Sequence, residues 1–161
     1  MATISHSIRR DEEVVRAAVP RVPPPAPSRF QTILLVEDEN VCRLTTRWFL
    51  ANFGYTVVPA RSAEEALALF APEIHDVVVT DHEMAALSGA EMAHIIKLRS
   101  PTTPVIMYTG RPPADRSCLD AVIQKPAHLL TLKAAIEAAL AARPAATGSR
   151  YSGCQPESPN R

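Results

Sequence analysis

The chain has 161 residues, carries no net formal charge and is 47% hydrophobic, so it fits one ordinary domain rather than two. No apolar run approaches the ~18 residues of a membrane span, and the acids near the start of the chain argue against a secretory signal peptide. Its three cysteines form no CxxC pair, so we expect neither a disulfide framework nor a zinc site, and a cytoplasmic location fits.

The prolines divide the chain into three regions. Of the 15 prolines, eight lie before residue 30 or after residue 142. Residues 1–29 are predicted to form a flexible Pro-rich arm, and residues 143–161, rich in Ser, Gly, Pro and Asn, a disordered tail. Residues 30–142 form the predicted domain, in which nine Lys and Arg face thirteen acids. This acidic balance argues against direct DNA binding.

The predicted domain begins with a strand and a helix. Thr32–Val36 is a continuous apolar run, as expected for a strand buried on both faces. The apolar residues that follow have near-helical spacing: Val41, Leu44, Trp48 and Phe53. Gly54 then provides a helix stop, and Tyr55–Val58 is the second predicted strand.

Two capping boxes open the next two helices. Ser62-Ala-Glu-Glu65 begins a helix that Pro72 ends, and Ser88-Gly-Ala-Glu91 begins another. The third predicted strand, Asp76–Thr80, lies between them.

Two strands and an alanine-rich helix complete the pattern, at Val105–Tyr108, Ala121–Gln124 and Leu129–Ala142. Strands that alternate with helices indicate an α/β fold, a doubly wound parallel sheet of five strands with right-handed crossovers. The ligand site of such a sheet lies at the carboxyl ends of the strands.

Polar residues follow four of the five strands. Glu37-Asp38-Glu39 comes after the first strand, Asp81 after the third, Thr109 after the fourth and Lys125 after the fifth. Clustered carboxylates repel unless a cation lies among them, and Mg²⁺ prefers oxygen ligands. We therefore predict a magnesium site here, although the acid pair, taken alone, is equally consistent with a helix cap.

Five segments of the chain resemble the receiver domain of two-component response regulators: Ile33-Leu-Leu-Val-Glu-Asp-Glu39, Asp76-Val-Val-Val-Thr-Asp-His-Glu-Met84, Gly89, Pro104-Val-Ile-Met-Tyr-Thr-Gly110 and Gln124-Lys-Pro126. The resemblance covers about residues 30–142, and it implies the flavodoxin-like fold of that family.

The resemblance also implies a role for each residue of the metal site. Asp81 would be the phosphoacceptor. Glu37, Asp38 and Asp81 would bind Mg²⁺ together with the backbone carbonyl of Glu83.

Two further residues would act on the transferred group. Lys125 would pair with the phosphoryl group, and Thr109 would donate a hydrogen bond to it. The Lys125–Pro126 peptide bond would be cis, as it is in the family.

The chain departs from the family pattern between the fourth and fifth strands. Lys125 follows Thr109 by only 16 positions, fewer than the family usually has, and Pro112-Pro113 disfavours a helix. We therefore expect the fourth helix to be shortened or missing. Val122 stands where the family often has an aromatic switch residue, so the usual output face is predicted to be remodelled.

Three smaller expectations concern single side chains. Glu83 and Arg111 are hypothesised to form an ion pair that screens the site and tunes the phosphoryl lifetime. Trp48 is expected in the core or on a helix face. The histidines without metal-ligand spacing are expected at the surface: His75, His82, His94 and His128.

These residues favour a stand-alone receiver domain rather than a turnover enzyme. It would accept phosphoryl groups from a sensor histidine kinase or a histidine phosphotransfer protein, and signal through contact with a downstream protein. One alternative is a degenerate receiver that acts as a phosphorylation-independent scaffold. Another is an aspartyl-phosphate phosphatase, which would need an Asp-x-Asp motif that Asp81-His-Glu83 does not provide.

Overall fold

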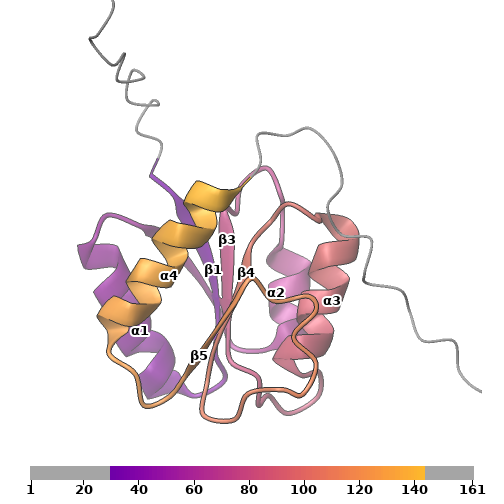
Figure 1. The fold of residues 1–161 in the computed structure, drawn as a ribbon. Helices are drawn as coiled ribbons and strands as arrows, with labels where there is room; N and C mark the ends of the chain where they lie inside the picture. The colour runs from indigo at the N-terminus through magenta and orange to yellow at the C-terminus, as the bar shows by residue number, and fades with distance from the viewer. Residues whose placement is uncertain (1–29, 144–161) are drawn as a thin grey trace, which may run out of the picture.

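The computed structural model describes residues 30–143, so the predicted arm at 1–29 and the predicted tail from residue 144 lie outside the described residues. Nine elements follow one another along the described chain (Figure 1). They are β1 (Thr32–Val36), α1 (Asn40–Asn52), β2 (Thr56–Ala60), α2 (Ala63–Leu69), β3 (Val77–Thr80), α3 (Gly89–Arg99), β4 (Val105–Thr109), β5 (Ala121–Gln124) and α4 (Leu129–Ala142).

The five strands form one parallel sheet in the order β2-β1-β3-β4-β5. The chain runs from β1 outward to β2 and then returns to the other side of β1 to form β3. This reversal places the topological switch point between β1 and β3, where open α/β sheets bind ligands at their carboxyl ends. The predicted doubly wound, flavodoxin-like sheet is confirmed.

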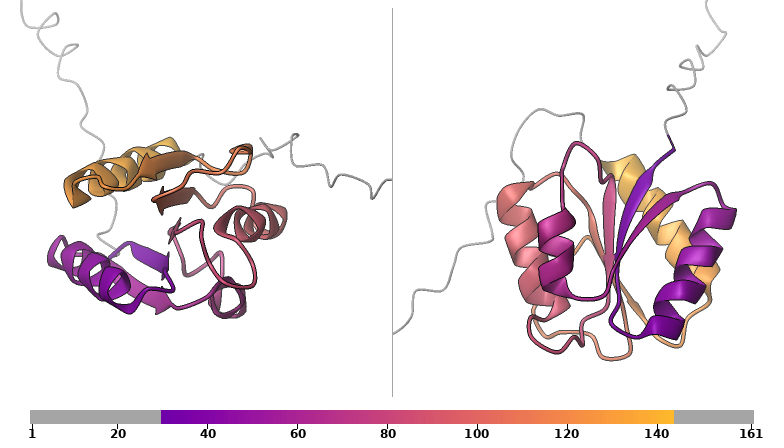
Figure 2. Two further views of the ribbon diagram at one scale, coloured as in Figure 1. Left: turned by 90° about the horizontal axis from the view of Figure 1, so that it is seen from below. Right: turned by 180° about the vertical axis from the view of Figure 1, so that it is seen from behind.

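Helices cover both faces of the sheet, as the two views in Figure 2 show. On one face α1 and α4 pack on an apolar cluster that includes Leu50, Leu132 and Ile136. On the other face α2 and α3 pack on a second cluster, with Met92 and Ile96 from α3. Because the strands are apolar on both faces, the sheet is buried between the two helix layers. Polar side chains of a site can therefore gather at the ends of the strands.

Local signals set the ends of the helices. The Ser88–Glu91 capping box forms in full at the start of α3. At α2 only half of the predicted box forms: the Ser62 side chain accepts from Glu65 N, but the Glu65 carboxylate accepts from Arg61 N instead. Gly54 follows the end of α1 with φ of 87°, a conformation that favours glycine.

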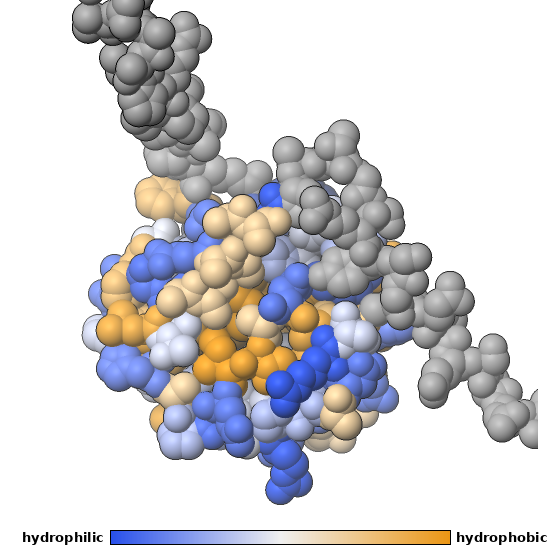
Figure 3. Space-filling model, viewed as in Figure 1, coloured by the Kyte–Doolittle hydropathy of each residue, from blue (hydrophilic) through white to orange (hydrophobic). Residues whose placement is uncertain are grey.

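The segment between β4 and β5, residues 110–120, forms no helix. This confirms the predicted loss of the fourth helix, and it leaves β5 as a short edge strand whose Val122 is half-buried. In the space-filling view of Figure 3, apolar residues lie beside α4 and over β5. The surface next to the edge strand β5 is therefore formed by a loop, segment 110–120, where a helix would otherwise lie.

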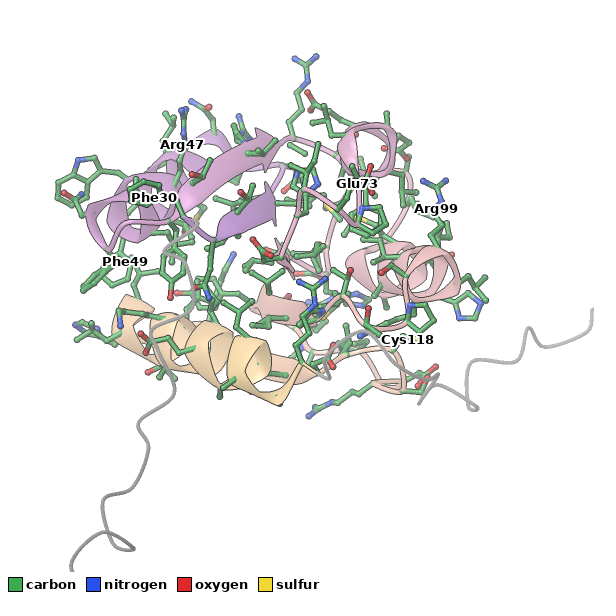
Figure 4. All side chains as sticks on the ribbon, turned by 90° about the horizontal axis from the view of Figure 1, so that it is seen from above. Phe30, Arg47, Phe49, Glu73, Arg99 and Cys118 are labelled. Atoms are coloured by element: carbon green, nitrogen blue, oxygen red, sulfur yellow. The ribbon has the colours of Figure 1, made fainter. Side chains whose placement is uncertain are left out.

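The apolar spacing predicted the helix α1, and the structure shows that Trp48 lies on its exposed face rather than in the core. Val41, Leu44 and Trp48 are exposed, Trp48 by 71%, whereas Thr46 and Leu50 are the buried residues of this helix. In Figure 4, Phe49 lies on the side of α1 toward α4, and Arg47 lies on the opposite side. The burial of α1 is decided by its neighbour α4, which the spacing of apolar residues alone does not reveal.

Two other expectations also differ from the structure. The second strand runs from Thr56 to Ala60 and includes Pro59, which an edge strand tolerates because one side of it needs no ladder hydrogen bond. His75 is only 3% exposed, so its predicted surface position is wrong. Its ring stacks on Phe70 in the turn that leads into β3.

The cysteines are not all free. Cys118 is disulfide-bonded, contrary to the expectation from three scattered cysteines, and Cys42 is free. The predicted cytoplasmic location stays a prediction. Among residues 30–143, no helix is both long and apolar enough to cross a membrane.

Candidate functional site

Residues that follow three different strands meet at the carboxyl end of the sheet, the end that faces the viewer in the left panel of Figure 2. Lys125 follows β5, and its ammonium Nζ lies 2.7 Å from Glu37 Oε2 and 2.8 Å from Asp81 Oδ2. Glu37 follows β1 and Asp81 follows β3, the two strands that flank the switch point. One cation thus bridges two carboxylates that are 44 residues apart in the sequence.

The loop after β3 fixes the orientation of Asp81. Its Oδ1 accepts hydrogen bonds from the backbone N–H groups of His82 and Glu83, and its Oδ2 meets Lys125. The Asp81 carbonyl accepts from the Thr80 hydroxyl at 2.7 Å. Gly89, the first residue of α3, approaches so closely that a Cβ there would lie 1.9 Å from this carbonyl oxygen. The loop after β3, called the acceptor loop below because Asp81 is the predicted phosphoacceptor, therefore leaves no room for a side chain at position 89.

The pKa values of the two carboxylates that share Lys125 shift in opposite directions. Burial raises the pKa of Glu37 above its ordinary value, and the hydrogen bond and charge of Lys125 offset this only in part. Burial also acts to raise the pKa of Asp81, but hydrogen bonds from Lys125 and Thr109 outweigh it and lower that pKa. The difference has a physical cause, because Asp81 accepts more hydrogen bonds. Asp81 is therefore held in the ionised form.

Thr109, the last residue of β4, is fully buried. Its side chain helps to lower the pKa of Asp81, and its hydroxyl donates to the Arg111 carbonyl at 3.4 Å. The same hydroxyl oxygen accepts from Arg111 N at 3.3 Å. Thr109 thus links Asp81 to the start of the remodelled segment 110–120.

The acid pair after β1 does not cap α1. That cap is Glu39, whose side chain accepts from Val41 N and Cys42 N. The alternative interpretation of Glu37 and Asp38 as a helix cap is therefore wrong, and their side chains remain available to the site.

Arg43 holds the backbone of the acid pair. Its guanidinium donates to the carbonyl oxygens of Glu37 at 2.7 Å and Asp38 at 3.2 Å, and to the side chain of Asn40. Arg43 was not among the residues predicted for the site. The signal for it was its place in the first turns of α1, from which a long side chain can reach back to the preceding loop.

The oxygen atoms at this end of the sheet fit the chemistry of Mg²⁺. Glu37 and Asp81 converge, and Asp38 lies exposed beside Glu37 in the same loop. All of the predicted ligands, including the Glu83 carbonyl, are oxygen donors, which Mg²⁺ prefers. Within residues 30–143, no three His, Cys, Asp or Glu side chains are grouped so as to hold a metal ion. The metal site therefore stays a prediction.

Glu83 and Arg111 form the ion pair that the sequence suggested, with 3.3 Å between Arg111 Nη1 and Glu83 Oε1. Both side chains are largely exposed, and such pairs are worth little in stability. The pair joins the loop after β3 to the segment after β4, so it lies at the rim of the site. Its effect on a phosphoryl group stays a prediction.

Comparison with protein families matches residues 33–137 to the response regulator receiver domain. The cyclic di-GMP phosphodiesterase of Thermotoga maritima is 30% identical over 115 residues, which are 68% of this chain and 31% of that protein. The response regulator protein FleR of Pseudomonas aeruginosa is 33% identical over 85 residues, which are 53% of this chain and 18% of FleR. The chain thus spans less than a third of the length of these relatives.

Solved structures of receiver domains match this chain over nearly their whole length. A receiver domain protein from Clostridium thermocellum superposes with a TM-score of 0.66 and 29% identity, covering 70% of this chain and 95% of that one. The response regulator TrrA of Thermotoga maritima, solved in complex with Mg²⁺ and BeF, gives a TM-score of 0.65 and 27% identity, covering 68% of this chain and 99% of TrrA. The residues after β1, β3 and β5 therefore belong to a fold that matches these solved domains over nearly their whole length.

Proposed function

Since the chain belongs to the response regulator receiver domain family, we propose that it accepts a phosphoryl group on Asp81 from the phosphohistidine of a sensor histidine kinase or a histidine phosphotransfer protein. The observation that carries the proposal is the Lys125 ammonium 2.8 Å from an ionised Asp81 carboxylate at the switch point of the sheet. Such a carboxylate is a nucleophile with a cation already beside it.

The proposed transfer replaces a P–N bond of the donor with a P–O bond to Asp81. A carboxylate oxygen of Asp81 attacks phosphorus, the P–N bond to the donor histidine breaks, and the imidazole leaves with the electron pair and takes up a proton. The ammonium of Lys125 and the hydroxyl of Thr109 then contact the phosphoryl oxygens, whose charge they offset. The product is an acyl phosphate, which water hydrolyses.

Mg²⁺ is the cofactor that we propose for this site. Glu37, Asp38, Asp81 and the backbone carbonyl of Glu83 would hold it, and when bound it neutralises charge on the transferred group. Arg43 supports this set, because it fixes the backbone of the residues that supply two of the carboxylates.

The output is proposed to run through contact with another protein in the cytoplasm, in a phosphorelay. The added dianion attracts Thr109, and Thr109 is joined through its hydroxyl to Arg111 and thus to segment 110–120. Because this segment has no helix and β5 carries Val122, the surface that responds differs from the usual one. We expect the partner to recognise this remodelled side of the domain.

The test is covalent labelling by a small phosphodonor such as acetyl phosphate in the presence of Mg²⁺. We expect stoichiometric labelling of the wild type and none of the Asp81→Asn variant, read by intact-protein mass spectrometry. The Asp76→Asn variant serves as a matched control, because Asp76 lies at the opposite end of β3. Label that persists in Asp81→Asn would contradict the proposal.

The phosphorylation-independent scaffold remains a second candidate because segment 110–120 is remodelled. It predicts that the wild type binds its partner equally well with and without phosphodonor. A partner affinity that changes with labelling would exclude it.

A further inference from the structure

Tyr108 precedes Thr109 on β4 and has no part in the proposed transfer. The side chains of successive strand residues point to opposite faces, so Tyr108 lies on the α1 and α4 side of the sheet. It is half-buried there against the apolar cluster of that face. Two of its contacts lead to Lys125 and the turn that follows it.

The first contact is a hydrogen bond to the backbone after Lys125. The Tyr108 hydroxyl donates to the Ala127 carbonyl at 3.0 Å. At the other end of this short turn, Lys125 N donates to the Thr109 carbonyl at 2.7 Å. The last two residues of β4 therefore hold both ends of the turn 125–127, and Lys125 lies inside it.

The second contact is made by the ring. The Lys125 ammonium lies 5.0 Å from the centroid of the Tyr108 ring, within the range of a cation–π interaction. Its other close partners are Glu37 and Asp81. A lysine side chain is flexible, so a contact on a further side of the ammonium restricts its position more than the two carboxylates alone do. The Tyr108 ring provides that contact.

We propose that Tyr108 is a positioning residue that holds the Lys125 ammonium where it meets the acceptor carboxylate. The hydroxyl fixes the backbone of the turn and the ring fixes the charged end of the side chain. This proposal rests on the proposed function, because the ammonium that is positioned is the one that would contact the phosphoryl group.

Three variants separate positioning from packing. Tyr108→Leu removes the ring and the hydroxyl, and Tyr108→Phe removes only the hydroxyl. Phe53→Leu is the matched control, because the Phe53 ring lies 5.1 Å from the ammonium of Lys133, away from the acceptor loop. A simple loss of aromatic packing should affect both positions alike.

We expect the initial rate of labelling by acetyl phosphate at saturating Mg²⁺ to fall about tenfold in Tyr108→Leu, which corresponds to about 1.4 kcal/mol in the barrier. Tyr108→Phe should recover part of this loss, and Phe53→Leu should label at the wild-type rate. The Mg²⁺ dissociation constant, measured by calorimetry, should stay within about twofold in all three, because Tyr108 contacts none of the predicted metal ligands. Wild-type labelling by folded Tyr108→Leu would overturn the proposal, as would equal losses in labelling and Mg²⁺ affinity.

A second measurement stands apart from phosphorylation. The ring of Tyr108 should shift the NMR signals of the Lys125 Cε protons upfield, and the shift should persist in Tyr108→Phe and vanish in Tyr108→Leu. If the wild type is not labelled but this pattern appears, the proposed function fails while the positioning contact stands. If the signals are the same in all variants, the positioning proposal fails by itself.

Discussion

The sheet has a buried lysine at one end and a half-buried lysine at the other, and the two lysines meet different numbers of carboxylates. At the amino ends of β4 and β5, Lys97 of α3 donates to the Thr103 carbonyl at 2.8 Å and to Asp120 Oδ2 at 2.7 Å, and its side chain is 1% exposed. At the carboxyl ends, Lys125 donates to two carboxylates, and its side chain is 21% exposed.

The pKa values of the two lysines shift in opposite directions for this reason. Burial lowers the pKa of Lys97, and Asp120 offsets only part of that effect. Burial acts in the same direction on Lys125, but the hydrogen bonds and charges of Asp81 and Glu37 outweigh it and raise its pKa. At the amino end the Lys97 ammonium thus meets one carboxylate, whereas at the carboxyl end the Lys125 ammonium meets two carboxylates and is more open to solvent. An end of the second kind is suited to bind a cation and an anionic group.

The largest expected difference between the two ends is in chemistry. Lys125→Met should lower the rate of labelling by acetyl phosphate by about 10²-fold or more, the usual loss when a group that stabilises developing charge is removed. Lys97→Met should change the rate per folded molecule by less than about twofold, because Lys97 lies at the far end of the sheet. Rates are compared after the folded fraction is measured by circular dichroism. Equal losses in both variants would remove the distinction between the two lysines.

The next effect is on stability, where we expect the substitution of Lys97 to matter more than that of Lys125. Lys97→Met removes the ammonium that lies 2.7 Å from the Asp120 carboxylate, so we expect the free energy of unfolding to fall by about 3–5 kcal/mol in urea titrations. Adding Asp120→Asn should recover much of the loss, because an amide oxygen can still accept from Val105 N without a charge. A loss below about 1 kcal/mol in the single variant would mean that the buried pair is not a structural one.

A smaller effect should come from added Mg²⁺. At ten times its dissociation constant, an ion that binds only the folded chain raises the free energy of unfolding by about 1.4 kcal/mol. Asp38→Asn should weaken this gain, whereas Asp120→Asn at the amino end should not, although both remove one acid. Thermal unfolding at increasing Mg²⁺ measures the effect. The same gain in Asp38→Asn as in the wild type would exclude Asp38 as a ligand.

The smallest effect is a dependence of stability on pH at the amino end. Burial lowers the pKa of His75, so the unfolded chain takes up a proton that the folded chain disfavours. The free energy of unfolding should therefore fall as the pH drops below about 6.5, by at most about 1.4 kcal/mol per pH unit.

Two variants isolate the contribution of His75 to the pH dependence of stability. His75→Leu should flatten the slope between about pH 7 and 5.5, while the exposed His128→Gln should not. Glu37, whose pKa is raised, contributes with the opposite sign and is present in both variants. An unchanged slope in His75→Leu would assign the pH dependence to other groups.

The sequence predicted the sheet and the ends of its strands well. Apolar runs flanked by turns defined β5 and α4 with the bounds that the structure has, and Pro112-Pro113 predicted the missing helix. The convergence of Glu37, Asp81 and Lys125 followed from topology, because the carboxyl ends of parallel strands share one edge. The family's cis bond before Pro126 is also present.

Other features depend on contacts between distant segments and were not predictable from spacing. The apolar residues of α1 indicated a helix, but Trp48 turned out to lie on its exposed face because α4 covers another side. Lys97 and Asp120 lie 23 residues apart on elements whose adjacency only the fold defines. Tyr108 was read as an ordinary strand residue, since its partner Ala127 lies in a turn without a sequence signature.

The close approach of Gly89 to the Asp81 carbonyl has a consequence for how such chains vary. The smallest side chain at that residue would occupy the volume of a backbone oxygen, and this clash is independent of metal, partner or phosphorylation. Position 89 therefore reports on the shape of the acceptor loop by itself. A homologous chain with any other amino acid there must have rebuilt the loop, even if every ionisable residue around it is unchanged.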